Sequence, residues 1–564
     1  MTTTLLRGGI VVDGTGSPPR RADVVIDGDV IARVDDDIDG SFDRTIDVTG
    51  LVVSPGFIDL HTHYDAQVLW DPDMTPSSWH GVTTVVAGNC GFGIAPVRPD
   101  DRSAIVNTLE TVEGMSRTAL TEGITWEFET FPEYLDAVRR RSLRSNMAFF
   151  IGHTPLRIYV MGDDAFERKA TSDEIAEMVG HVRDAMANGA VGFATSASPT
   201  HVGDRGRPVP SRLAGADEIE QIVAEVGRWG GLLQATAGPG LSPTDFSRLS
   251  VAHGVKITWA AALVGQESFL ADIAGMQELR RPAIEVVEAQ AALPGNVWPQ
   301  VTPRPVTFQM MLDVPPGSLA SLPAFHDIFE VPRAERLDVY RTTEWRDRAR
   351  PQVLEAWRHR WSRITVAEST ADSSAVGRTL EDLAAARDTT PFDVMVDLAV
   401  GGTTRYREVL LNDDPEQVVR LLEHESTTLG LSDAGAHASQ LCDACLPTDL
   451  IARWVRDRAA FSLEHAIHML TGQPAEIVGL ADRGTIVAGH KADLVVFDLD
   501  TIDTQPEQRW FDLPGDEDRV VVESVGFVHV WVNGTQVRQD GIELLVTEAA
   551  GRIVGGTRLG RSDG

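Results

Sequence analysis

The sequence predicts an α/β protein whose main body is a (β/α)₈ TIM barrel, with a small β-sandwich domain built from both chain ends and a helical insertion late in the barrel. Three observations predict this fold. Apolar and polar residues alternate with a period of two at both ends, and strand and helix patterns alternate eight times between them. Late in this body, one stretch is longer than a simple connection between a strand and a helix. A doubly wound open sheet is the alternative, because it shows the same alternation.

Both ends of the chain have the patterning of β-strands. Apolar and polar residues alternate in "LLRGGIVVDGTG" and "ADVVIDGDVIARV", and Asp-Gly pairs separate the runs as hairpin turns do. The same alternating pattern occurs near the C-terminus, in "GTIVAGHKADLVVFDLD" and "VGFVHVWVNGTQVRQDG". We therefore assign residues 1–54 to the first part of one small sheet domain, and residues 481–564 to its second part and a tail.

Residues 55–480 have the pattern of the barrel. Helical segments such as "SDEIAEMVGHVRDAMANG" open on a capping residue, repeat apolar positions at helical spacing and close on Gly. They alternate with short apolar runs that we expect to form strands. These runs are residues 56–60, 83–87, 147–151, 190–194, 231–236, 255–260, 297–301 and 427–431.

The stretch at about 315–425 is too long for one βα connection. It contains three helical segments of its own, "PQVLEAWRHRWSRI", "TLEDLAAARD" and "TPFDVMVDLAVGG". The sequence predicts that this stretch folds as an insertion over the mouth of the barrel.

Composition excludes several classes of partner. The 564 residues include 50 basic and 83 acidic ones, a formal charge of −33, which repels phosphate backbones and anionic lipid. We therefore expect a small-molecule substrate and no nucleic-acid or membrane partner, and a homo-oligomer is compatible with the sequence. Three cysteines and an N-terminal segment without the apolar stretch of a signal peptide predict a cytoplasmic protein.

His61 and His63 follow the first predicted strand in "SPGFIDLHTHYD". Side chains alternate along a strand, so the two imidazoles point to the same side, roughly 6–7 Å apart along the chain. That spacing lets both rings reach one metal ion, each nitrogen about 2 Å from it. A chance pair on a solvated strand is the alternative.

Other reactive residues also follow predicted strands, and the active site of a barrel lies at that end of its strands. Cys90 follows the second strand and could bind a zinc-like ion as a thiolate, or pack as a small apolar residue. Asp433 follows the last strand. Its carboxylate could take a proton from an attacking water and give it to a leaving nitrogen, or cap a turn.

Four more residues are candidates for substrate contact. They are His153 and Arg157 after the third strand, His201 in a proline-rich loop after the fourth, and His437 after the eighth. Each has an ordinary alternative. His153 could be a hydrogen-bonded loop histidine and Arg157 a solvated arginine. The loop of His201 could be a plain surface loop, and His437 could cap a helix. The pair Cys442 and Cys445 has CxxC spacing but lacks the second pair or the thioredoxin-like context that a zinc or redox site needs.

These motifs resemble a known family. "SPGFIDLHTHYD" resembles the first barrel strand of the amidohydrolase superfamily, which hydrolyses amide and related bonds with one or two metal ions. "GVTTVVAGNCGFGIAP", "GHTPLR" and "GLSDAGAH" resemble its N-acyl-D-amino-acid deacylase (D-aminoacylase) branch. The resemblance implies that Cys90 is a metal ligand and that Asp433 is the catalytic aspartate. The fourth strand, "AVGFATSA", lacks the lysine that other amidohydrolases carbamylate.

The sequence departs from this branch at two places. Strands five and six, "GGLLQATAG" and "VKITWAAAL", lack the two histidines that complete the family's tightly held metal site. Gln234, Thr236, Lys256 or Trp259 occupies the space instead, and His253 lies at the wrong end of its strand. The arginine expected after Asp433 to bind a substrate carboxylate is also absent.

We therefore expect a metal-dependent amidohydrolase, similar to an N-acyl-amino-acid deacylase, that cleaves a non-peptide C–N bond with metal-activated water. Its cofactor would be zinc or a similar divalent metal, with one ion held by His61, His63 and Asp433 and with Cys90 as a further candidate ligand. A degenerate barrel that acts as a binding or assembly module is the alternative. Non-hydrolytic metal chemistry, such as a lyase reaction, is a third possibility, because fold does not fix function.

Overall fold

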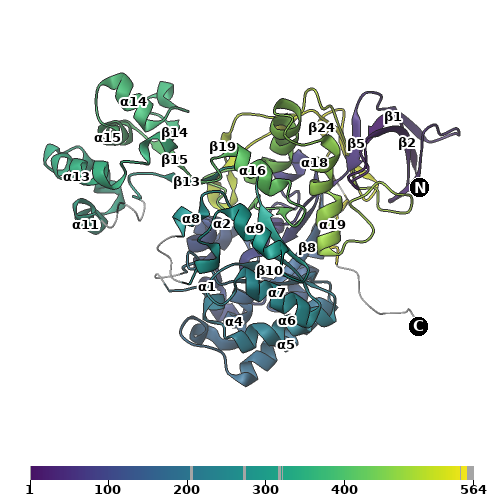
Figure 1. Ribbon diagram of the computed structural model, residues 1–564, viewed down its shortest axis with the longest axis horizontal. Helices are drawn as coiled ribbons and strands as arrows, with labels where there is room; N and C mark the ends of the chain where they lie inside the picture. The colour runs from purple at the N-terminus through teal and green to yellow at the C-terminus, as the bar shows by residue number, and fades with distance from the viewer. Residues whose placement is uncertain are drawn as a thin grey trace. The chain divides into compact units, whose positions relative to one another are not determined.

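The computed structural model describes residues 2–203, 207–270, 275–315, 319, 322–546 and 548–555. The chain divides into two compact units. Residues 1–304 and 414–564 form the first unit, and Pro305–Asp413 form the second. Figure 1 shows the elements of both.

The first unit contains the predicted barrel. Eight strands lie in the order β16-β12-β11-β10-β9-β8-β7-β6, and all neighbouring pairs are parallel. The eight apolar runs of the sequence correspond to these strands, which confirms the fold class. The strands are β6 (Phe57–Asp59), β7 (Val82–Ala87), β8 (Asn146–Gly152), β9 (Gly192–Ser196), β10 (Leu232–Thr236), β11 (Lys256–Ala260), β12 (Val297–Val301) and β16 (Thr428–Leu429).

The barrel closes through residues that follow its first and last strands. Thr62 and Ala434 form a parallel bridge, and the backbone N–H of His63 donates to the carbonyl oxygen of Ala434 at 2.7 Å. Closure therefore brings the loop that carries Asp433 against the loop that carries His61 and His63.

Helices surround the strands for the reason that the sequence indicates. In α5 (Ser172–Ala187), a capping box of Thr171 and Glu174 satisfies free N–H groups of the first turn. The buried residues of α5, such as Ile175, Met178 and Val182, recur at helical spacing and face the core. The other helices of this layer are α3 (Phe131–Arg139), α4 (His153–Met161), α6 (Ala216–Arg228), α7 (Pro243–His253), α9 (Ala283–Ala291), α16 (Pro415–Leu422), α18 (Leu463–Leu470) and α19 (Gly472–Val478).

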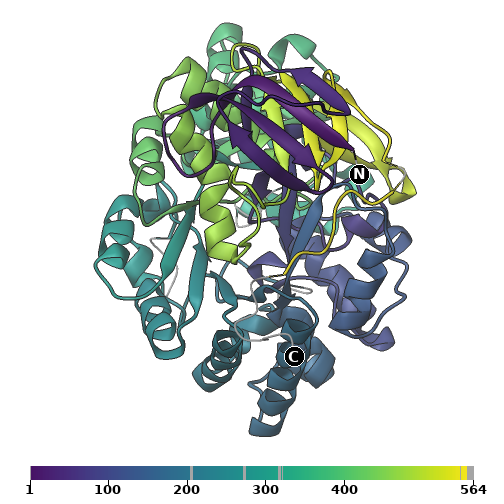
Figure 2. The same ribbon diagram turned by 90° about the vertical axis from the view of Figure 1, so that its right-hand side faces the viewer.

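The two chain ends share one nine-stranded sheet, in the order β24-β23-β22-β17-β5-β1-β2-β3, with β4 paired to β1. Figure 2 shows the purple N-terminal strands beside the yellow C-terminal ones. The two sets meet where β5 pairs antiparallel with β17. The strands are β1 (Thr3–Val11), β2 (Arg20–Asp27), β3 (Val30–Asp35), β4 (Arg44–Asp47), β5 (Val52–Pro55), β17 (Leu494–Phe497), β22 (Phe527–Val532), β23 (Thr535–Gln539) and β24 (Ile542–Glu543).

The chain passes from β5 into β6 through Gly56. A Cβ atom at this position would lie 2.1 Å from Oγ1 of Thr83, so only glycine lets the strand pass this close to β7. The small sheet domain thus leads directly into the strand that precedes His61.

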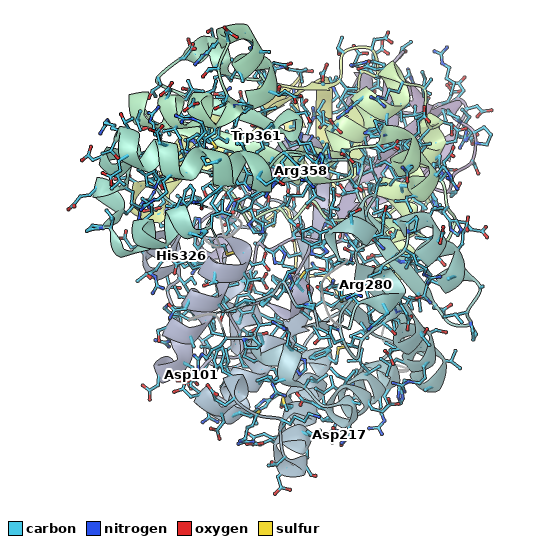
Figure 3. All side chains as sticks on the ribbon, turned by 60° about the vertical axis from the view of Figure 1, so that its left-hand side comes forward. Asp101, Asp217, Arg280, His326, Arg358 and Trp361 are labelled. Carbon is cyan, nitrogen blue, oxygen red and sulfur yellow. The ribbon has the colours of Figure 1, made fainter. Side chains whose placement is uncertain are left out.

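The second unit starts and ends earlier than the predicted insertion at 315–425. Its helices are α11 (Pro323–Glu330), α12 (Arg336–Tyr340), α13 (Thr343–Ala356), α14 (Leu380–Arg387) and α15 (Pro391–Gly401). It also contains an antiparallel sheet that the sequence reasoning missed, in the order β13-β15-β14 (Val306–Met310, Thr404–Leu411 and Ile364–Ser369). It has its own apolar core, to which Trp361, labelled in Figure 3, contributes.

Candidate metal centre

His61 and His63 lie just beyond the end of β6, and both side chains are buried. Their rings are 5.4 Å apart between centroids and meet edge to face at 61°. Nε2 of His61 lies 3.2 Å from Oδ1 of Asp433, and Nε2 of His63 lies 3.8 Å from the same oxygen. The first and last strands of the barrel therefore bring these three side chains together.

The orientation of His61 is set by a residue on another strand of the barrel. Its Nδ1 lies 2.5 Å from Oε1 of Gln300 on β12, and Nε2 of Gln300 donates to Oγ1 of Thr258 on β11 at 3.2 Å. An amide oxygen only accepts hydrogen bonds, so Nδ1 carries the proton and the Nε2 lone pair faces Asp433. This is the tautomer that a metal ligand needs.

Cys90 adds a sulfur atom to the cluster. It lies in a one-turn 3₁₀ helix, η3 (Asn89–Gly91), with a φ of 56°, and its Sγ is 3.3 Å from Nε2 of His61. Burial raises the pKa of the Cys90 thiol well above its usual value, and the nearby carboxylates of Glu113 and Asp433 raise it further. The donor atoms of Cys90, His61 and His63 all lie within 4.8 Å of one another, so these residues could hold a metal ion.

Asp433 lies on the open side of this cluster, with 36% of its side chain exposed. Its φ of 46° places it in the left-handed region, and Ser432 beside it donates a hydrogen bond from Oγ to the carbonyl oxygen of His61 at 3.0 Å. A non-glycine residue in this conformation is strained, which is common at functional sites.

Glu113 is a member of the cluster that sequence reasoning missed. It is the last residue of α1 (Arg102–Glu113), and its Oε2 lies 3.6 Å from Nε2 of His63. Burial raises the pKa of Glu113 well above its usual value, as do the charges of Asp433 and Asp65. One signal could have found it: Ile105, Leu109 and Glu113 are four residues apart on the buried face of α1.

Two of the predicted substrate contacts lie near the cluster. The backbone N–H of His437 donates to the carbonyl oxygen of Glu113 at 2.7 Å. Nδ1 of His201 is 2.7 Å from Oγ of Ser196, and its ring packs on Phe92 with centroids 5.3 Å apart. Burial lowers the pKa of both histidines, with Arg212 adding to the effect at His201, where the pKa falls to about 3. Both rings are therefore neutral at pH 7.

The predicted substrate roles of His153 and Arg157 are corrected by their surroundings. Both side chains are fully buried and bind Glu218, the inward-facing neighbour of the exposed Asp217 that Figure 3 labels on α6. Nε2 of His153 and Nη1 of Arg157 lie 2.8 and 2.5 Å from Oε1 of Glu218. These side chains join α4 to α6 and have no free face for a substrate.

Polar residues other than histidine enter the barrel from strands five and six. Oε1 of Gln234 on β10 accepts a hydrogen bond from the backbone N–H of Cys90 at 2.7 Å. Thr258, the partner of Gln300, is the inward residue of β11. The suggestion that Lys256 or Trp259 fills this space is wrong, because Lys256 binds the carbonyl oxygen of Glu476 and Trp259 stacks on Phe246 of α7.

The remaining cysteines and His253 make contacts of their own. Cys442 and Cys445 are buried free thiols, and Sγ of Cys445 donates to the carbonyl oxygen of Cys442 at 3.1 Å. His253 is at the end of α7, where its Nε2 lies 2.6 Å from Oε1 of Glu220.

A cavity of about 390 Å³ adjoins the cluster at His63. Its wall includes Trp70, the paired side chains of Glu110 and Arg117, and Ser439. A small molecule in this cavity would lie beside His63, as a substrate of this site must. No helix in the described part of the chain is long and apolar enough to cross a membrane.

A parallel barrel with imidazole, thiol and carboxylate donors at the carboxyl ends of its strands is the architecture of a metal-dependent enzyme. The model of the amidohydrolase family matches residues 44–538. This range covers most of the chain, so the protein belongs to the amidohydrolase family.

Similar proteins agree with this assignment. A D-aminoacylase of Alcaligenes xylosoxydans xylosoxydans is 31% identical over 98% of this chain and 97% of its own. An N-acyl-D-glutamate deacylase of the same organism is 28% identical over 94% of this chain and 93% of its own. A solved D-aminoacylase, described as having a binuclear metal centre with one-metal activation and second-metal attenuation, superposes with a TM-score of 0.65. That structure is 28% identical to this chain and covers 98% of it and 100% of its own chain. The protein is thus a metal-dependent hydrolase that acts on C–N bonds other than peptide bonds.

Proposed function

We propose that this hydrolase removes the acyl group from an N-acyl amino acid or a closely related small amide, and that it does so with one divalent ion, zinc or a similar metal. The observation that carries the proposal is the convergence of His61, His63 and Asp433, whose donor atoms approach each other to 3.2 and 3.8 Å. The deacylase relatives support the substrate class.

The donor set fits a zinc-like ion. Zinc takes imidazole, thiolate and carboxylate ligands, and a catalytic site keeps one position open for water. His61, His63, Cys90 and Asp433 offer these atoms, and the exposed side of Asp433 faces outward. The inward polar atoms of Gln234 and Thr258 already bind Cys90 and Gln300, which supports one ion rather than two.

An ion bound there would polarise the scissile carbonyl and make water a better nucleophile. The side chains of this chain do the rest. Asp433, close to both histidines and partly exposed, takes the proton of the attacking water and gives it to the leaving nitrogen. Gln300 holds His61 in one tautomer throughout. The cavity wall at Trp70 and Arg117 holds the substrate, and Arg117 is placed to approach a carboxylate group on it.

The test is an assay of metal-loaded protein against N-acyl-D-amino acids, their L-enantiomers and simple N-acyl amines, with the metal content measured by elemental analysis. We expect about one ion per chain. At saturating metal, Asp433→Asn should lower kcat by a factor of about 10² to 10⁴, the range of general acid–base catalysis. Asp217→Asn on the outer end of α6 is the matched control and should leave kcat unchanged.

Two results would contradict the proposal. Folded, metal-loaded protein without activity on any of these amides would rule out the substrate class, and full activity of Asp433→Asn would rule out the proton-transfer role.

The degenerate-barrel alternative rests on the missing histidines of strands five and six, but no feature of the described cluster favours it. Three expectations stay predictions from the sequence: a cytoplasmic location, a homo-oligomer, and the absence of nucleic-acid or membrane partners.

A further inference from the structure

The last turn of α1 directs a carboxylate into the metal centre, and the backbone around it is fixed. Gly114, with a φ of 59°, ends the helix and donates its N–H to the carbonyl oxygen of Leu109. The carbonyl oxygen of Glu113 accepts the N–H of His437 at 2.7 Å. Such contacts hold the side chain of Glu113 in one place beside His63.

We propose that Glu113 is a ligand of the metal ion, so that α1 supplies an oxygen donor to a site otherwise built from the ends of strands. This inference deepens the proposed function, because it concerns the same metal centre. It requires that an ion binds there, and it does not depend on which amide is cleaved.

The distances are those of ligands rather than of a hydrogen bond. Two donor atoms that bind one tetrahedral zinc ion, each 2.0–2.3 Å from it, are about 3.3–3.8 Å apart. Oε2 of Glu113 lies 3.6 Å from Nε2 of His63, inside this range. The distance is too long for a good N–H···O hydrogen bond, which is 2.7–3.2 Å. The pairs His61–Asp433 at 3.2 Å and His61–Cys90 at 3.3 Å are similarly spaced.

The side chain of Glu113 is also buried. It is only 6% exposed, and within the described residues its carboxyl group faces His63, itself 2% exposed, rather than a lysine or an arginine. Buried carboxylates in proteins are usually paired with a cation or coordinate a metal ion. A divalent ion between Glu113 and the neighbouring donor atoms would fill that role.

Glu113 is on helix α1, whereas the ligands that the family resemblance implies all follow barrel strands. Gln234 and Thr258, the inward residues of strands five and six, are occupied by Cys90 and Gln300. A donor from α1 therefore completes the set of ligands from another direction.

The test compares Glu113→Gln with Glu110→Gln, a matched control one turn earlier on the same helix. Glu110 is partly exposed and pairs with Arg117. Zinc affinity is measured by competition with a chelator, and the ligand field is followed by the visible absorption of the Co²⁺-loaded protein. Glu113→Gln should weaken zinc binding by at least about 10-fold and change the Co²⁺ spectrum, since even supporting contacts are worth 10–100-fold. Glu110→Gln should match the unmodified protein in both.

Unchanged zinc affinity and an unchanged Co²⁺ spectrum in Glu113→Gln would overturn the inference. If that variant does not fold, as judged by circular dichroism of the metal-free protein, Glu113→Asp takes its place. It keeps the charge but shortens the reach, and it should also bind zinc more weakly; equal affinity would overturn the inference as well. Both readings are made without substrate, so a failure to hydrolyse N-acyl amino acids leaves this test intact.

Discussion

Oε1 of Gln300 lies 2.5 Å from Nδ1 of His61 and thereby turns the other ring nitrogen toward Asp433. This contact joins β12 to the end of β6, two strands that are not neighbours in the sheet order. The centre therefore depends on residues that bind no metal themselves but fix the rings that do.

Gln300→Met should weaken the metal centre without removing a ligand. Methionine has a similar length but cannot accept a good hydrogen bond from Nδ1–H of His61. The ring would therefore no longer be held in one tautomer and one orientation. We expect metal affinity to fall by about 10–100-fold, with a parallel loss of activity at limiting metal. Chelator competition measures the affinity. Gln417→Met, at an exposed position on α16, should change neither value, and an unaffected Gln300→Met would refute the positioning role.

Cys90→Ser tests whether the thiol is a ligand. Serine keeps the size of the side chain but replaces a soft donor by a hard one, so zinc affinity should fall by about 10-fold or more. Far-UV circular dichroism should stay the same, since the backbone N–H of Cys90 still binds Gln234. Cys445→Ser, buried but outside the cluster, is the control. Equal zinc affinity in Cys90→Ser would show that Cys90 is only a packed apolar residue.

The strand ends of the barrel could be predicted because their signal is local. The first and last apolar runs end within two residues of His61 and Asp433, the polar residues that face the site. The errors are all non-local. The sheet of the second unit pairs Val306 with Leu411, residues that no local pattern connects. His153 and Arg157 are next to a strand end, but they bind Glu218 more than 60 residues away. Glu113 reaches the centre from a helix, where strand periodicity gives no signal.

Arg117→Gln should affect substrate binding rather than the chemical step. Arg117 lines the cavity next to His63, with 53% of its side chain exposed and an ion pair to Glu110. For substrates with a free carboxylate, losing this cation should raise KM by about 5- to 20-fold and leave kcat almost unchanged, because the contact is the same in the ground and transition states. N-acyl amines without a carboxylate serve as the internal control. An equal rise of KM for both substrates would mean that Arg117 only supports the cavity wall.

The buried trio of Glu218, His153 and Arg157 should make the stability of the barrel depend on pH. Burial alone would raise the pKa of Glu218, but the hydrogen bond from His153 and the charge of Arg157 lower it to about 2, from 4.5 in the unfolded chain. A carboxyl whose folded-state pKa is depressed stabilises the fold above its unfolded pKa, and this stability is lost as the pH falls toward its folded pKa. The window is thus about pH 4.5 to 2, and the contribution of Glu218 to the free energy of unfolding at neutral pH is roughly 3 kcal/mol.

Urea unfolding of the metal-free protein at several pH values measures this contribution. Glu218→Gln should be less stable at pH 7 and should lose less stability across this window, whereas Asp217→Asn, at an exposed position on the same helix, should keep the slope of the unmodified protein. An unchanged slope in Glu218→Gln would show that the trio does not hold its charge in the folded state.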